Sequence, residues 1–195
     1  MANSMKELLV DNLRDLFNAE NQLVKALPKM ARKATSPMLA EAIENHLAET
    51  EEQIERLREA FEILDERPGG KHCAGMEGLI EEGREALEHD NDALRDAAII
   101  AAAQKVEHYE IAGYGCAVAY AELLELSDIV SILNETLDEE KSADENLSEI
   151  AETEVHPQAV LAGLEEDDME EDDGESMDEE EMEYDEEEEY ETADR

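Results

Sequence analysis

Residues 9–30, LVDNLRDLFNAENQLVKALPKM, indicate the fold class of this chain. Their apolar side chains recur in alternating steps of four and three residues, which places them on one face of an α-helix. The face comprises Leu9, Leu13, Leu16, Glu20, Leu23, Leu27 and Met30. Such a stripe predicts a long helix, from about Met5 to Ala34, that packs against other helices and carries the carboxylate of Glu20 at its middle.

Three further segments show the same spacing, over about residues 37–65, 92–126 and 128–154. A shorter amphipathic piece over residues 76–87 is expected to connect the second long helix to the third. Four long helices joined in this way predict an all-α, antiparallel four-helix bundle with a short crossover helix. The composition agrees, because strand-forming aromatic residues are sparse: the chain has no Trp, 2 Phe and 5 Tyr.

The chain is strongly acidic, with 57 Asp and Glu against 15 Lys and Arg, and a formal net charge of -42. Residues 165–195 hold 21 of these acids and one Arg. With so few apolar side chains, this part cannot bury a core. We therefore divide the chain into a helical bundle, residues 1–158, and a disordered acidic tail, residues 159–195. A surface of this sign repels phosphate groups, which argues against nucleic-acid and membrane partners.

The cellular compartment follows from features that the sequence lacks. The longest run without a charged side chain, residues 111–121, falls short of the roughly 20 apolar residues that a bilayer span needs. The first residues show no basic segment followed by an apolar run, and Cys73 and Cys116 follow no disulfide or zinc pattern. We expect a cytoplasmic protein, and its acidic surface also fits adaptation to high salt.

Several acids stand where the helical stripes are otherwise apolar. Glu20, Glu107, Glu110 and Glu140 lie near the middle of three stripes, and Glu49 lies beside the middle of the remaining one. Midpoints of antiparallel helices meet at one depth, so these side chains should converge inside the bundle. Buried like charges are costly, and either bound cations or protonation must offset that cost. Two divalent ions, iron or manganese with magnesium or calcium as alternatives, would satisfy these oxygens.

Three neighbouring side chains are weaker candidates for the same site. His46 is three residues before Glu49, and Gln53 extends the same edge of that helix. Asp144 follows Glu140 by one helical turn and is either a ligand or solvent-facing. A single acid in a helix seam usually extends its carboxylate to water. The prediction of a metal site therefore depends on acids occurring at the same depth on all four helices.

These segments are also similar to those of a known family. Residues 13–23 (LRDLFNAENQL), 46–57 (HLAETEEQIERL), 106–115 (VEHYEIAGYG) and 136–144 (TLDEEKSAD) resemble motifs of the YciE/YciF-type ferritin-like family. The resemblance covers about residues 4–155 and leaves out the acidic tail. It implies a ferritin-like bundle, a homodimer, an association with stress responses and a di-metal carboxylate site.

The wider ferritin-like pattern uses one Glu on each of two helices and Glu-x-x-His on the other two. By this resemblance, Glu20 and Glu107 match the single acids, with Glu110 as an added one. Glu49 and Glu140 match the first residues of the two Glu-x-x-His motifs.

The imidazole of both Glu-x-x-His motifs is missing, since Glu52 and Ala143 stand at its positions. His46, Gln53 and Asp144 are then the candidates to replace the missing imidazoles as ligands. With fewer nitrogen ligands, the site offers mostly hard oxygen donors and carries more negative charge. The first functional hypothesis is a di-metal protein that binds iron or manganese, with Fe²⁺ oxidation or peroxide handling as its activity. The alternative is a structural or interaction protein with a degenerate site, whose acidic tail contacts basic partners or loose cations.

Overall fold

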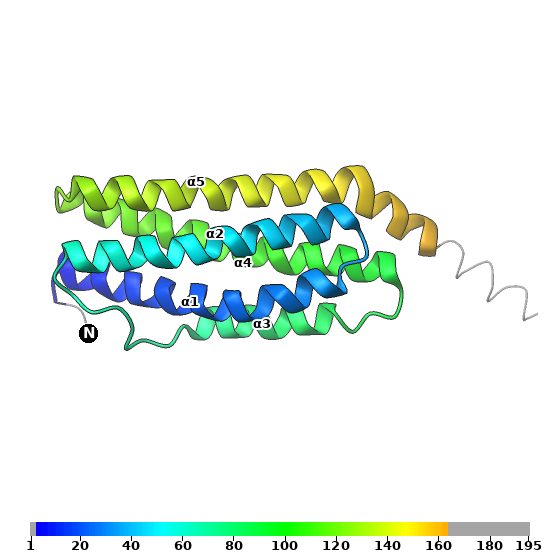
Figure 1. The fold of residues 1–195 in the computed structure, drawn as a ribbon, viewed down its shortest axis with the longest axis horizontal. Helices are drawn as coiled ribbons and strands as arrows, with labels where there is room; N and C mark the ends of the chain where they lie inside the picture. Colours follow the sequence, from blue (N-terminus) through cyan, green and yellow to red (C-terminus); the bar gives the residue numbers. More distant parts are fainter. Residues whose placement is uncertain (1–2, 164–195) are drawn as a thin grey trace, which may run out of the picture.

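The computed structural model describes residues 3–163, which form a bundle of long helices (Figure 1). The elements are α1 (Met5–Lys33), α2 (Pro37–Ile63), α3 (Ala74–Ala86), α4 (Asp92–Leu123), α5 (Ser127–Ile150) and the π-helical turn η1 (Ala151–Val155). Helix α1 packs against α2 and α4, and α5 packs against the same two helices, each pair antiparallel. The short α3 lies on α1 and α4. The predicted four-helix bundle with a crossover helix is confirmed for this part of the chain.

The starts of the first two helices follow from local chemistry. Ser4 caps α1, because its hydroxyl accepts a hydrogen bond of 3.1 Å from the backbone N–H of Glu7. Ser36 caps α2 in the same way, accepting from the N–H of Leu39 at 3.2 Å. Pro37 occupies the first position of α2, where a helix needs no N–H donor. These caps satisfy backbone donors that a helix start leaves unpaired.

The end of the last long helix differs from the sequence prediction. The sequence predicts an end at about Glu154, before His156 and Pro157, whereas helical backbone continues through η1 to Gly163. Proline lacks an N–H and crowds the carbonyl four residues earlier, and a wider turn directly before it accommodates both effects. The division at residues 158 and 159 and the disorder of the tail stay predictions, because residues 164–195 lie outside the described ones.

The interior of the bundle consists of two apolar halves with a polar layer between them. One half surrounds Leu23, Leu39, Ile100 and Ile150, and the other surrounds Leu9, Leu57, Phe61 and Leu133. All four long helices contribute buried polar side chains between these halves. They are Glu20, His46, Thr50, Gln53, Glu107, Glu110, Thr136 and Glu140. The fold therefore places carboxylates at mid-depth, as the interrupted stripes predict.

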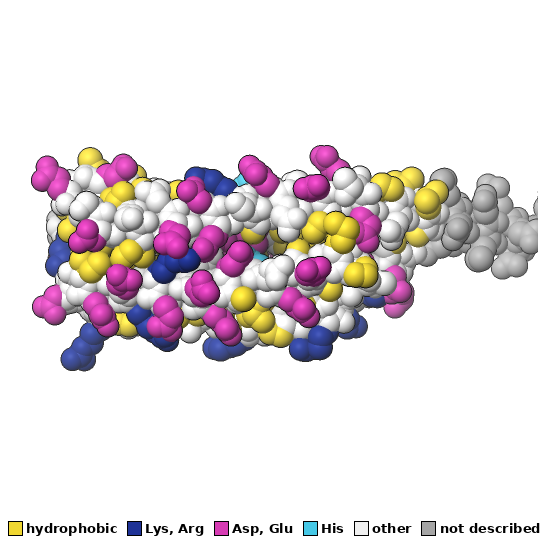
Figure 2. All heavy atoms as spheres, turned by 45° about the horizontal axis from the view of Figure 1, so that its top comes forward, with side chains coloured by type: hydrophobic (Ala, Val, Ile, Leu, Met, Phe, Trp, Pro, Cys, Tyr) yellow, Lys and Arg dark blue, Asp and Glu magenta, His cyan; other side chains and the backbone are white. Residues whose placement is uncertain are grey.

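Acidic side chains are scattered over the whole face shown in Figure 2, where they outnumber Lys and Arg. None of the helices within residues 3–163 combines the length and apolar character that crossing a membrane requires. The acids of the surface and those of the interior are thus two separate groups.

Candidate metal centre

Four side chains from three helices meet in the polar layer. They are His46 of α2, Glu107 and Glu110 of α4, and Glu140 of α5. One ligand-type atom from each lies within 4.8 Å of the others, and all four residues are buried. Glu107 and Glu110 share one face of α4 because they are three residues apart. This geometry can hold a metal ion.

Glu20 of α1 lies against this group. Its Oε1 accepts a hydrogen bond of 2.5 Å from the phenol of Tyr114, and the pair is fully buried. The carboxyl of Glu110 is the other neighbour of Glu20 and can donate a hydrogen bond to it when protonated. Tyr114 therefore fixes one oxygen of Glu20 and leaves the other for the centre.

Most polar atoms of the centre have no hydrogen-bond partner among the described residues. The unpartnered atoms are Glu20 Oε2, both ring nitrogens of His46, Glu107 Oε2, and both carboxyl oxygens of Glu110 and Glu140. Native proteins pair nearly all buried polar groups, so such a concentration calls for a ligand. No Lys or Arg within residues 3–163 forms an ion pair with these acids. A bound cation would satisfy both the lone pairs and the charge.

The carboxyl groups hold protons tightly when no cation is bound. Burial is the largest cause and, together with the charges of Glu20 and other acids, it outweighs a hydrogen bond from Glu140 and raises the pKa of Glu107 to about 8. Burial, followed by the charge of Glu20, lifts the pKa of Glu110 and that of Glu140 well above the usual range. Burial also raises the pKa of Glu20. Protonation is thus the alternative to a metal that the sequence left open.

His46 is the one imidazole in the cluster. Its Nε2 lies 3.4 Å from Glu107 Oε1, and its Nδ1 lies 3.8 Å from Glu49 Oε2. Burial lowers the pKa of His46, but the Glu49 carboxylate and the charges of Glu140 and Glu20 outweigh burial and raise the pKa. The imidazole therefore bridges the buried acids and the more exposed Glu49.

Three other predicted site residues lie around the cluster rather than in it. The side chain of Glu49 is 45% exposed at the outer side of His46. Gln53 is buried, and its amide donates a hydrogen bond of 3.1 Å to Glu139 Oε2. Asp144 accepts a hydrogen bond of 3.3 Å from Gln104, and its other oxygen lies 3.6 Å from His108 Nε2. Their role as metal ligands stays a prediction.

A structural clamp beside the centre was not predicted from the sequence. Arg56 of α2 donates two hydrogen bonds of 2.6 Å to the two oxygens of Glu139 on α5, and Gln53 donates to one of these oxygens. Gln53 and Arg56 are three residues apart on α2, a spacing that places both on one helix face. This spacing in the sequence could have indicated that Gln53 and Arg56 act together. Their shared partner on α5, Glu139, depends on how the two helices pack. The clamp therefore pairs the charge of Glu139 with a guanidinium beside the cluster.

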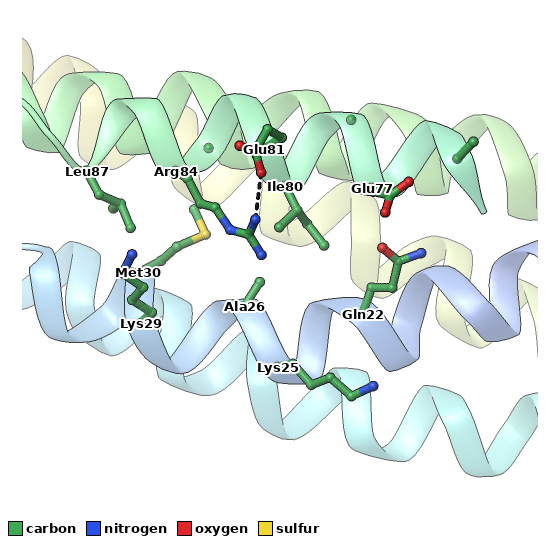
Figure 3. Close-up of a pocket in the computed structure, with 13 residues that line it drawn as sticks. Gln22, Lys25, Ala26, Lys29, Met30, Glu77, Ile80, Glu81, Arg84 and Leu87 are labelled. Atoms are coloured by element: carbon green, nitrogen blue, oxygen red, sulfur yellow. Dashed lines mark hydrogen bonds and ion pairs between the residues drawn. The ribbon is translucent and has the colours of Figure 1, made fainter. Parts of the chain in front are cut away.

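A pocket of about 290 Å³ opens beside the centre between α2, α4 and α5. His46 and Glu107 line its inner side, and its other lining residues include Glu49, Glu139 and Ala143. A larger groove, of about 590 Å³, lies between α1 and α3 and contains no residue of the cluster (Figure 3). The smaller pocket is therefore the one placed to admit small solutes to the centre.

Comparison with known proteins places the chain among homologues of similar size. A family model described as "Domain of unknown function (DUF892)" matches residues 4–160. The chain is 42% identical to Protein YciF of Escherichia coli strain K12 over 158 residues, which cover 80% of this chain and 95% of that protein.

Solved structures of such proteins share the fold. The crystal structure of the Escherichia coli stress protein YciF matches with a TM-score of 0.75, 42% identity, and coverage of 77% of this chain and 96% of that chain. YcfI from Rhodopseudomonas palustris matches with a TM-score of 0.73, 47% identity, and coverage of 75% and 94%.

Proposed function

Because this chain belongs to the DUF892 family, we propose that it is a stress-response protein whose buried His and Glu side chains bind divalent metal ions. The proposal assigns two ions to each chain, with iron or manganese as the metals. The description of the Escherichia coli relative as a stress protein supports the physiological part. The unpartnered atoms of the cluster support the chemical part.

The observation that carries the proposal is the close approach of His46, Glu107, Glu110 and Glu140, whose ligand-type atoms lie within 4.8 Å of one another. Apart from the Tyr114 phenol on Glu20, the described residues outside the cluster supply no hydrogen-bond donor to these carboxylates. Once ionised, the carboxylates form an anionic pocket that cations neutralise. Glu20 adds a further oxygen beside Glu110. Because a pair of ions shares bridging carboxylates, four carboxylates and one imidazole suit two ions better than one.

The ligand chemistry selects among metals. Carboxylate oxygens with one imidazole suit Fe²⁺ and Mn²⁺, and they disfavour metals that need several soft or nitrogen ligands. When bound, iron would supply one-electron chemistry, which fits Fe²⁺ oxidation or the handling of peroxide. The protein's own contribution is to exclude water, to hold Glu20 through Tyr114, and to expose one opening at His46.

Metal analysis of the chelator-treated protein, reconstituted anaerobically with Fe²⁺ or Mn²⁺, tests the proposal. We expect about two ions per chain, and a loss of affinity of at least tenfold, roughly, in Glu110→Gln and Glu140→Gln. The matched controls are Glu122→Gln on α4 and Glu145→Gln on α5, both exposed, which should bind like the original protein. Absence of bound metal in the original protein, or equal losses in the controls, would contradict it.

A non-catalytic role is the second candidate, and the ligand set is the observation that favours it. Among the described residues, His46 is the one histidine of the cluster, whereas the ferritin-like pattern has two. Such a centre would bind metal without turnover. Aerobic addition of Fe²⁺ separates the two roles. If the centre is catalytic, the original protein oxidises iron faster than the variant Glu110→Gln. If the centre is purely structural, the two proteins oxidise iron at the same rate.

A further inference from the structure

The second half of α1 and the start of α2 contain a stretch without acids. Residues 21–40 hold no Asp or Glu, although the chain has 57 of them, and no other stretch of the sequence without acids is as long. The same residues carry four cations: Lys25, Lys29, Arg32 and Lys33. A basic strip of this kind contrasts with the acidic surface elsewhere (Figure 2).

None of these four cations forms an ion pair with another residue of the described range. Other basic residues do, for example Lys71 with Asp11 and Lys105 with Glu82, both at 2.6 Å. Cations in the last turn of a helix interact favourably with the helix dipole, which accounts for Arg32 and Lys33. That effect fades within one turn, so it does not account for Lys25 and Lys29.

Lys25 and Lys29 border the groove between α1 and α3, of about 590 Å³. The groove is apolar inside, where Ala26 and Met30 of α1 face Ile80 and Leu87 of the crossover segment (Figure 3). On the α3 side the Arg84 guanidinium extends toward α1, 2.6 Å from Glu81. The groove thus combines an apolar floor with the cations Lys25 and Lys29 on the α1 side, whereas on the α3 side Arg84 stands beside the acids Glu77 and Glu81. An acidic peptide that also carries apolar side chains fits the floor and the α1 side.

We propose that residues 164–195 of this same chain bind in this groove and along the basic strip. Residues 165–195 carry 21 Asp and Glu against one Arg, so the charge is complementary to that of Lys25, Lys29, Arg32 and Lys33. The segment also offers side chains for the apolar floor: Met169, Met177, Met182, Tyr184 and Tyr190.

The point at which the described chain ends favours this occupant over a separate acidic partner. Val155 belongs to the same core cluster as Ala31 of α1, and Ser36 donates a hydrogen bond of 3.0 Å to Glu154. The last helix therefore leaves the bundle at the end of the molecule where the basic strip lies. The 32 residues after Gly163 span up to about 100 Å when extended, ample for a groove along the 13-residue α3. Covalent linkage gives them an effective concentration of about millimolar, which no free partner matches easily.

Zero-length cross-linking of the full-length protein with a water-soluble carbodiimide tests the proposal. The reagent joins a Lys amine to a carboxyl group in contact with it, and mass spectrometry identifies the joined residues. We expect bonds from Lys25, Lys29 or Lys33 to acids of residues 165–195. Their yield should stay constant on dilution by about a hundredfold, because the contact is intramolecular. It should fall at least fivefold, roughly, in 1 M salt, where the screening length shrinks to about 3 Å.

Lys105 and Lys141 serve as internal controls, because both are exposed and lie outside the groove. The variant Arg84→Gln should lower the yield at Lys29, whereas Lys141→Gln should leave it unchanged. If Lys105 and Lys141 formed cross-links to residues 165–195 in the same yield as Lys25, Lys29 and Lys33, the contact would be non-specific and the proposal would be overturned. A yield that falls on dilution would assign the groove to the segment of a second copy, and no bond at all would exclude this occupant.

Discussion

The phenol of Tyr114 on α4 donates a hydrogen bond of 2.5 Å to Oε1 of Glu20 on α1, and neither residue is exposed to solvent. The bond joins the two helices at the boundary between the carboxylate layer and the apolar half around Phe61. Burial, together with the charge of Glu20, raises the pKa of Tyr114 well above its usual range, so the phenol remains a donor.

The variant Tyr114→Phe should destabilise the metal-free protein by about 1–3 kcal/mol, because it leaves a buried carboxylate oxygen without its donor. Urea unfolding measures this change. Tyr120→Phe on the same helix is the matched control, because Tyr120 is only half-buried and should change stability by less than about 0.5 kcal/mol. Equal effects in both variants would show that the hydrogen bond contributes nothing.

The stability of the metal-free protein should fall as pH rises from about 5 to 9. The folded state raises the pKa of Glu107 from 4.5 to about 8, so within that interval the folded protein keeps a proton that the unfolded chain releases. The free energy of unfolding therefore decreases with rising pH, by on the order of a few kcal/mol across the window. Thermal unfolding between pH 5 and 9 measures the slope.

Repulsion between surface acids also makes the free energy of unfolding depend on pH, and substitutions separate that contribution from the one of Glu107. The variant Glu107→Gln cannot titrate at this position and should make the profile shallower, with the remaining slope due to Glu20, Glu110 and Glu140. The exposed Glu122→Gln should keep the full slope. Added Mn²⁺ should also flatten the profile, because the ion favours ionised ligands. A slope that is the same in Glu107→Gln and in the original protein would refute the assignment.

Two glycines of α4 should respond oppositely to the same substitution. A Cβ at Gly113 would lie 2.7 Å from Cδ2 of Leu16, which is buried and must shift, whereas a Cβ at Gly115 would meet nothing within 4 Å. Gly115→Ala should stabilise the protein by about 0.5–1 kcal/mol through helix propensity. Gly113→Ala should be less stable than Gly115→Ala by about 1–3 kcal/mol, since overcrowding opposes the same gain. Chemical denaturation of both variants measures the difference, and equal stabilities would contradict the close contact of α4 with Leu16.

A bulky side chain in the pocket beside His46 should slow metal exchange without weakening binding. Ala143 lines this pocket but offers no ligand atom, so Ala143→Phe narrows the opening and leaves the ligands in place. Stopped-flow mixing with Mn²⁺, and with a chelator afterwards, should give slower association and slower release by a similar factor. Ala119→Phe, at an exposed position of α4, is the control. Unchanged rates in Ala143→Phe would mean that ions reach the centre by another path.

Periodicity in the sequence was enough to predict the four long helices and the depth of their acids. Apolar residues at steps of three and four fix which face of each helix turns inward, whatever its neighbours are. Glu20, Glu107, Glu110 and Glu140 interrupt such faces near their middles, and all four are buried in one layer. The family resemblance pointed to the same residues and is confirmed by the match over residues 4–160.

Periodicity does not predict which of the residues around the cluster point into it. His46 and Glu49 lie three residues apart on one edge of α2, and the sequence proposes both for the site. The rotation of α2 in the bundle turns His46 toward Glu107 and leaves Glu49 at the rim. Asp144 has partners of its own in Gln104 and His108.

The sequence by itself thus determined the helices, their inward faces and the level at which charge is buried, because these depend on spacing along one chain. Tertiary structure alone decided that His46 joins the cluster, that Arg56 pairs with Glu139, and that Tyr114 reaches Glu20. Each of these depends on how far one helix is rotated or shifted against another. Rotation of a helix about its axis exchanges a ligand for a surface residue, and that rotation is set by how the side chains of all the helices pack together.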